Sequence, residues 1–146
     1  MLIEIRRAET TDVSALFDVR TSVRENHLSR EQLCGLGITE DSIADMITAS
    51  TCAWVAVIGC EIVGFSMIDS ADGSLFAAFV LPSHEGKGVG KQLVFTAEQE
   101  LFRHFAEIWL ETAKDSRAAE VYRHLGWRNE READGNQIRM TKTRIS

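Results

Sequence analysis

The chain has 146 residues, of which 45% are hydrophobic and 26% charged, and it contains one proline. This length suits one domain, and the composition excludes a disordered or collagen-like chain. Sixteen Lys and Arg residues against 22 Asp and Glu residues give a net charge of −6. The basic residues are scattered, whereas sequence-independent binding to nucleic acid needs clustered cations. We therefore predict a single domain over residues 1–146 with no nucleic-acid partner.

The sequence also bears on the cellular compartment. Residues 1–7 alternate apolar and charged side chains, unlike a signal peptide, and no segment approaches the roughly 20 apolar residues that cross a bilayer. Cys34, Cys52 and Cys60 form an odd count without CxxC spacing, which is typical of reduced thiols in small, buried or half-buried positions. We expect a cytoplasmic protein with no membrane partner.

The first half of the chain predicts a strand, two helices and three further strands. Residues 2–6 alternate with period 2, as in a strand, and residues 10–12 supply capping side chains for a helix start. Residues 23–36 are polar without a clear period, and a second helix starts at Thr39. Three β-rich runs follow, at residues 52–58, 62–68 and 74–81. The third run is continuously apolar, which predicts a strand covered on both faces.

The second half begins with a glycine-punctuated loop at residues 82–90. Apolar residues then recur four apart and form one stripe along a helix: Val89, Leu93, Ala97, Leu101 and Phe105. The chain ends with a strand, a helix and a hairpin, at residues 108–112, 118–125, 127–132 and 137–143. This order predicts a mixed sheet with helices on both sides. The strands that flank the long helix should run parallel.

Residues 85–91, Glu-Gly-Lys-Gly-Val-Gly-Lys, carry the most chemical information. Three alternate glycines let successive backbone amides converge without Cβ atoms, and the helix N-terminus adds partial positive charge. Lys87 and Lys91 add full charges beside these amides. Together these features predict a cradle for a phosphate or pyrophosphate. The spacing fits neither a P-loop nor the dinucleotide fingerprint Gly-x-Gly-x-x-Gly.

At these residues the sequence resembles the GCN5-related N-acetyltransferase (GNAT) family. Residues 85–90 match the family's acetyl-coenzyme A motif, Gln/Arg-x-x-Gly-x-Gly/Ala. Residues 118–127 resemble its pattern of small residues, a tyrosine and Leu-Gly-Phe/Trp, and residues 5–12 resemble its first strand and helix start. The resemblance spans nearly the whole chain. It implies the GNAT fold, an α/β (α+β) architecture with a mixed, mostly antiparallel central sheet of six to seven strands and helices on both faces.

The resemblance also implies a co-substrate, acetyl-CoA, and the residues that bind it. Backbone amides at the helix start would hold the pyrophosphate, and strand residues would hold the pantetheine arm where the fourth strand splays from the fifth. The implied cofactor-binding residues are Phe79, Val80, Leu81, Glu85, Gly86, Lys87, Gly88, Val89, Gly90, Lys91 and Asp115. Two of them depart from the family pattern. Glu85 replaces Gln or Arg and puts a carboxylate near the phosphates, and Asp115 stands where many members have Asn.

Tyr122 occupies the position of the family's general acid, which protonates the departing thiolate. A phenol with a pKa of about 10 is a reasonable proton donor to an alkyl thiolate, whose conjugate acid lies at about 8.5 to 10. The fourth-strand glutamate that some members use as a base has no match, since Ser74 falls near that position. Glu111 and His84 are candidates, although a paired carboxylate and a loop residue are simpler interpretations. The base therefore stays open.

The acceptor side carries weaker signals. In the family, the first two helices, their loop and the final hairpin line the acceptor cleft, and residues 23–30 belong to that loop here. Glu25 could attract a cationic amine, and Arg24 or Arg30 a carboxylate, although a solvated loop fits these residues as well. No paired ligand spacing occurs among the histidines, so we expect no metal.

The leading hypothesis is transfer of an acetyl group from acetyl-CoA to a primary amine of a small molecule, peptide or protein. A homodimer is common in the family and is a further expectation from the resemblance. Two other functions stay open. One is a catalytically degenerate acyl-CoA-binding sensor, which Glu85 and the missing strand glutamate motivate. The other is a protein that binds a phosphate ligand of nucleotide type.

Overall fold

A seven-stranded sheet organises the computed structural model, which describes residues 2–25 and 27–145. The strands are β1 (Glu4–Arg7), β2 (Ala53–Ile58), β3 (Glu61–Asp69), β4 (Ser74–Val80), β5 (Glu107–Ala113), β6 (Arg128–Glu132) and β7 (Gln137–Thr143). They lie in the order β1-β2-β3-β4-β5-β7-β6, and all neighbours are antiparallel except β4 and β5. The predicted mixed, mostly antiparallel sheet and its parallel step are confirmed.

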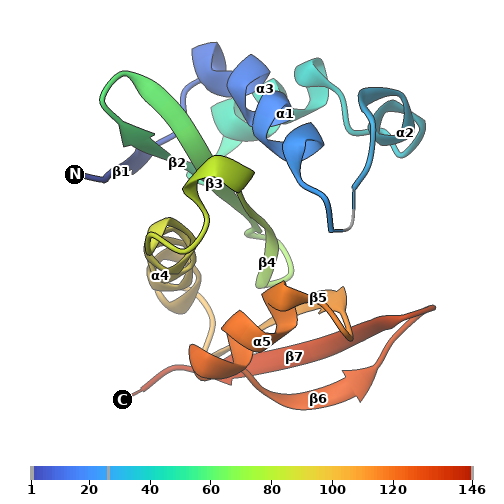
Figure 1. The fold of residues 1–146 in the computed structure, drawn as a ribbon. Coiled ribbons are helices and arrows are strands. Elements are labelled where there is room, and N and C mark those ends of the chain that lie inside the picture. The colour runs from blue at the N-terminus through green and yellow to red at the C-terminus, as the bar shows by residue number, and fades with distance from the viewer. Residues whose placement is uncertain (1, 26, 146) are drawn as a thin grey trace.

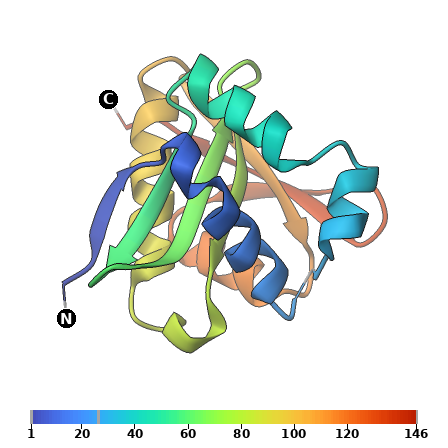
Figure 2. The same ribbon diagram turned by 90° about the horizontal axis from the view of Figure 1, so that it is seen from above.

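Helices cover both faces of this sheet (Figure 1, Figure 2). In the described residues they are α1 (Val13–Ser22), α2 (Arg30–Gly35), α3 (Glu40–Ala49), α4 (Val89–Phe102) and α5 (Arg117–His124), with 3-10 turns η1 (Thr10–Asp12) and η2 (Pro82–His84). Helix α1 lies over one face of β3 and β4 with α3 packed beside it, and α4 lies behind β2, β3 and β4 (Figure 2). Helix α5 packs against β5.

The short helix α2 is missing from the sequence prediction, which found no period in residues 23–36. A capping box starts it: Ser29 Oγ accepts a hydrogen bond from the Gln32 amide at 3.1 Å, and the Gln32 side chain accepts from the Ser29 amide at 2.9 Å. Only Leu33, which is 2% exposed, is buried in this helix. One buried residue makes no period, so periodicity could not reveal the helix.

The burial of β4 also differs from the prediction of a strand covered on both faces. Ser74 and Leu75 are buried, but Phe76 is 49% exposed and residues 77–80 are only half-buried. The reason is that β4 pairs with β5 at one position, Ser74 opposite Trp109, after which the two strands diverge (Figure 2). We call this divergence, between residues 75–80 and 110–113, the β4–β5 split.

The apolar stripe of the long helix is confirmed for its first four members, which are at most 1% exposed: Val89, Leu93, Ala97 and Leu101. Phe105, the fifth, lies beyond the helix end at Phe102 and is half-buried.

The three cysteines differ in exposure. Cys52 is buried, but Cys34 and Cys60 are exposed, so the expectation of buried or half-buried thiols is wrong for these two. The physical reason is position, since Cys34 lies near the end of α2 and Cys60 in the β2–β3 turn. Across residues 2–25 and 27–145, every helix is too short or too polar to span a membrane.

Candidate functional site

The loop before α4 and the first turn of α4 present a run of free backbone amides. Residues 85–88 are exposed, and Gly88, the N-cap residue, has a φ of 84°, a left-handed conformation that favours glycine. Among the described residues, no acceptor takes a hydrogen bond from the amides of residues 86–91. A Cβ atom added to Gly86 or Gly88 would meet nothing within 4 Å. These amides are free to donate to an anion.

The charges around this cradle are favourable to an anion. The first turn of α4 contains no acidic residue. Lys87 and Lys91 are both exposed at its rim. The 14-residue helix directs the positive end of its dipole to the same place.

Glu85, the carboxylate that departs from the family pattern, is tied to the start of α5. Its Oε2 accepts a hydrogen bond from Arg117 Nη1 at 2.9 Å, and the two side chains are 45% and 60% exposed. The amide of Arg117 donates to Glu25 at 3.0 Å. Arg117 therefore offsets the charge of Glu85, and Glu25 caps α5. Sequence reasoning missed Arg117 because these partners lie 32 and 92 residues away.

The N–H and C=O groups of β4 point alternately toward β3 and toward the β4–β5 split. The Leu81 amide donates to Val63 O at 2.8 Å, and Phe79 has the same phase in the ladder with β3. Alternate residues of an antiparallel strand point their main-chain groups to opposite sides. Those of Ala78 and Val80 therefore face the β4–β5 split. Ala78 was not among the residues expected to bind a ligand, because the phase of the ladder is not visible in the sequence.

Tyr122 lies on the buried face of α5 and is 8% exposed. Its ring packs edge-on against Trp127, with the centroids 6.0 Å apart. Burial raises the pKa of the Tyr122 phenol well above its usual value, and the nearby charge of Glu98 raises it further. The phenol therefore keeps its proton at neutral pH.

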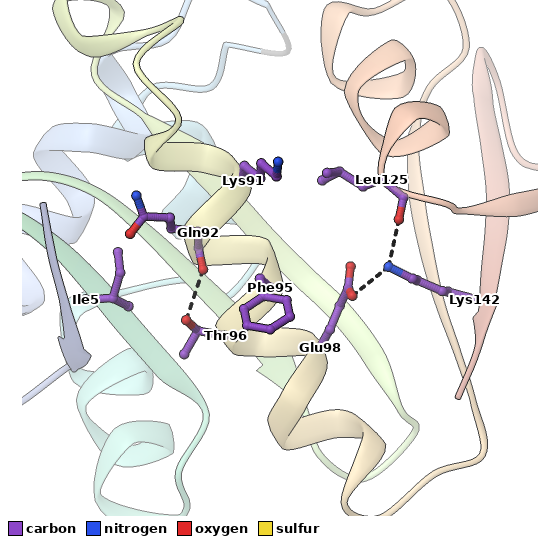
Figure 3. A pocket seen from close by; sticks show the side chains of 8 residues that line it. All are labelled: Ile5, Lys91, Gln92, Phe95, Thr96, Glu98, Leu125 and Lys142. Carbon is purple, nitrogen blue, oxygen red and sulfur yellow. Dashed lines mark hydrogen bonds and ion pairs between the residues drawn. The ribbon is translucent and has the colours of Figure 1, made fainter. Parts of the chain in front are cut away.

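A buried carboxylate joins α4 to the end of the chain. Glu98, which is 5% exposed, accepts hydrogen bonds from Trp127 Nε1 at 3.0 Å and from Lys142 Nζ at 2.8 Å. Lys142 Nζ also donates to Leu125 O at 2.7 Å. Figure 3 shows Glu98 and Lys142 facing each other across the space between α4 and the last strand. We call these residues the Glu98 cluster; it fixes the elements that carry and contact Tyr122.

The remaining candidates are engaged elsewhere or exposed. Glu111 is a paired carboxylate, because Arg139 donates to its Oε2 from Nη2 at 2.7 Å and from Nε at 3.0 Å. His84 Nδ1 lies 3.0 Å from Ser83 Oγ, and Asp115 is exposed in the turn before α5. Residues 2–25 and 27–145 contain no cluster of three His, Cys, Asp or Glu side chains suited to a metal ion.

Comparison with solved structures defines the class of fold. The PaiA N-acetyltransferase of Thermoplasma acidophilum, solved with coenzyme A, has a TM-score of 0.80 at 19% identity, over 99% of this chain and 100% of that chain. The ribosomal-protein-S18-alanine N-acetyltransferase of Escherichia coli has a TM-score of 0.71 at 20% identity, over 97% and 94%. YncA of Salmonella typhimurium, solved with its cofactor acetyl-CoA, has a TM-score of 0.73 at 15% identity, over 97% and 93%. The fold is that of the N-acetyltransferases.

The sequence itself settles the family. A model of the acetyltransferase (GNAT) family matches residues 16–127, so the chain belongs to that family. The resemblance found in the motifs is thereby confirmed. No curated protein sequence matches the chain.

Proposed function

We propose that this chain transfers the acetyl group of acetyl-CoA to a primary amine by direct attack of the amine. The observation that carries the proposal is the presence of two open main-chain surfaces close together in the chain. One is the run of free amides at residues 86–91, and the other is the free edge of β4 at Ala78 and Val80. Membership of the GNAT family and related folds solved with coenzyme A support the same cofactor.

The residues present fit coenzyme A. The free amides and the charges of Lys87 and Lys91 suit a pyrophosphate, and the ion pair with Arg117 offsets the carboxylate of Glu85. The main-chain groups of Ala78 and Val80 lie about 7 Å apart, on the side of the strand that faces the split. They suit the amides of a pantetheine arm. The Leu81 amide, which we expected to contribute, is taken by β3.

Bound acetyl-CoA supplies a thioester, whose acetyl group moves to the amine nitrogen as its C–S bond breaks. Tyr122 then donates its hydroxyl proton to the departing sulfur, which carries the electron pair of that bond. In this proposal the surplus proton of the amine passes to water, and water returns a proton to Tyr122. Glu111, one of the two candidate bases, is paired with Arg139. The strand edge and the cradle contribute mainly by holding the thioester in place for attack.

The test measures thiol release from acetyl-CoA with a panel of amines, for the wild type and Tyr122→Phe. We expect turnover with at least one primary amine and a loss of kcat of about 100-fold in Tyr122→Phe. The loss should lie toward the low end of general-acid effects, because burial makes this phenol a weaker acid than usual. The affinity for coenzyme A, measured by calorimetry, should not change, since Phe keeps the ring that packs on Trp127.

Three other results would contradict parts of this proposal or favour the sensor or the nucleotide-binding function. Tight binding of coenzyme A without turnover on any amine would contradict the enzyme and favour an acyl-CoA sensor. Displacement of coenzyme A by ATP or NAD would favour a nucleotide ligand. Full activity in Tyr122→Phe would remove this residue from the mechanism and leave the transfer reaction in place.

A further inference from the structure

Arg20, near the end of α1, has a buried polar group without a partner. Its Nη1 atom is buried and makes no hydrogen bond, and its Cζ atom lies 4.4 Å from the centroid of the Phe79 ring. Arg6 of β1 differs completely, since it donates to both oxygens of Asp12, the residue just before α1, at 2.8 and 3.0 Å. Within the described part of the chain, no carboxylate forms an ion pair with Arg20.

Arg20 lines a cavity of about 190 Å³ between the sheet and the helices α1, α2 and α3. The other described residues of the lining are all apolar, and they include Phe65, Met67 and Phe76. A cavity of about 150 Å³ already accepts benzene, so this one has space for an aromatic or branched aliphatic group. Burial in these surroundings lowers the pKa of Arg20, because no acid offsets the lost hydration.

The cavity also adjoins the strand edge that carries the proposed reaction. Ala77 and Phe79 line the cavity, and the main-chain groups of Ala78 and Val80 face the β4–β5 split. The cavity and the free edge of β4 therefore belong to the same stretch of one strand, residues 77–80. An acceptor held at Arg20 would lie beside the stretch of β4 that is proposed to bind the pantetheine arm.

The charged groups considered from the sequence do not compete for this role. Glu25 accepts the amide of Arg117, and Arg30 forms ion pairs with Asp18 at 3.0 Å and Glu40 at 3.1 Å. Arg24 is exposed to solvent in the loop after α1, whereas Arg20 has a buried donor atom without a partner.

We propose that Arg20 binds the carboxylate of the acceptor, and that the acceptor is an α-amino acid whose apolar side chain fills the cavity. This inference rests on the proposed acetyl transfer and narrows its substrate. A guanidinium offers paired N–H donors in the plane that a carboxylate needs, so an acceptor carboxylate would satisfy Nη1. The apolar lining offers nothing to a second charged group, which disfavours lysine-like or polyamine acceptors.

The experiment compares kcat/KM for acetylation of matched acceptors. L-leucine and L-phenylalanine carry the carboxylate, L-leucinamide and L-phenylalaninamide replace it with a neutral group, and isopentylamine and phenethylamine lack it; spermidine represents polyamines. We expect the wild type to prefer the acids over the amides by about 10- to 100-fold, the usual value of a charge-assisted hydrogen bond. Arg20→Met should abolish this preference by slowing only the acids. Arg24→Met, at an exposed position of the following loop, should retain it.

Thermal melting separates a binding role from a structural one. Arg20→Met replaces a half-buried cation that has no ion-pair partner with an unbranched apolar side chain, so the melting temperature should stay the same or rise. A clear fall would mean that Arg20 holds the fold together, and would overturn the inference. Arg20→Lys keeps a charge without the planar donors, and it should show an intermediate preference for acids.

Calorimetry distinguishes failure of this inference from failure of the proposed function. N-acetyl-L-leucine is titrated into protein saturated with coenzyme A, so no turnover is needed. Binding that Arg20→Met weakens about 10-fold or more supports the carboxylate site even if no amine is acetylated. Equal turnover of amines with and without a carboxylate, unchanged in Arg20→Met, overturns the site and leaves acetyl transfer standing. Absence of both turnover and binding with every acid also overturns it.

Discussion

Polar groups at the start of α4 lack hydrogen-bond partners among the described residues, whereas those in its second half are paired. At the start of the helix, the amides of residues 86–91 have no described acceptor and lie beside exposed residues. Less than three turns later, both oxygens of Glu98 accept hydrogen bonds in a nearly dry environment. In this molecule, polar groups that connect elements satisfy one another, whereas those expected to meet a ligand are left open. Arg6, which is paired with the N-cap residue of α1, and Arg20, near the end of that helix, show the same contrast.

The largest expected effect comes from removing the carboxylate of Glu98 and its hydrogen bonds. Glu98→Ala leaves the buried N–H of Trp127 without an acceptor and removes the anion that faces Lys142. We expect a loss of about 3 kcal/mol in the free energy of unfolding. In a chain of this size the melting temperature should fall by roughly 6 to 12 °C. Calorimetric melting and urea unfolding check both values.

Glu100→Ala is the matched control, because its half-buried carboxylate pairs only with exposed side chains, those of Arg103 and His104. It should cost less than about 1 kcal/mol. If the contrast between the helix ends holds, both variants retain coenzyme A affinity. A loss of affinity in Glu98→Ala at a temperature where it is fully folded would contradict the separation of the two ends.

The next largest effect comes from blocking the free amides at the start of α4 with a side chain. Gly88→Val places a branched side chain in the space above the free amides and in a left-handed backbone conformation. If it removes two charge-assisted hydrogen bonds, coenzyme A should bind about 100-fold more weakly while the domain stays folded. Gly59→Val is the control, since Gly59 has a φ of 64° and equally open surroundings in a distant turn. Both variants share the backbone strain of about 1 to 2 kcal/mol, and equal coenzyme A affinity in the two would refute the cradle.

The smallest effect concerns Arg6, whose guanidinium donates to both oxygens of Asp12. Hydrogen bonds from Arg6 and from the Glu9 amide hold the pKa of the Asp12 carboxyl below its usual value. The unfolded chain therefore binds more protons as the pH falls through the usual range of aspartate. The stabilisation is complete above that range and is lost as the pH falls through the lowered pKa of the folded state.

Asp12→Asn should therefore cost about 1 kcal/mol at pH 7 and progressively less in acid. Urea unfolding between pH 3 and pH 7, within the range where aspartate titrates, measures this difference. Asp18→Asn removes a carboxylate that is 72% exposed and should change stability little at any pH. A constant difference between wild type and Asp12→Asn across the range would show that the ion pair with Arg6 is not the cause.

The parts of the fold that sequence could predict are those with local causes. The stripe of α4 and the glycine cradle depend on residues within a few positions of one another, so periodicity and spacing revealed them. The apolar run of β4 was correctly identified as a strand, but its burial depends on where β5 leaves it. That divergence follows from the packing of the whole sheet, and nothing in residues 74–81 encodes it.

The site residues that escaped prediction depend on distant partners. Arg117 connects segments far apart in the chain, and an arginine near the end of an amphipathic helix such as Arg20 is ordinarily a surface residue. Its burial follows from the positions of α2, α3 and Phe79 around it. The motifs thus predict the cofactor, whereas the proposed acceptor site rests on tertiary contacts that the sequence does not show.

The two halves of the sheet are joined at one register pair of β4 and β5, Ser74 and Trp109, and several contacts hold Trp109 in place. The Trp109 amide donates to Gly73 O at 3.2 Å, its ring nitrogen donates to Asp72 O at 3.0 Å, and Arg139 stacks on the ring at 3.9 Å. From Ser74, β4 extends about 20 Å to its end. A rotation of about 3° between the two halves of the sheet then changes the width of the far end by about 1 Å, given that strand length. The width of the β4–β5 split at its far end therefore depends on the angle that the two strands make at Trp109.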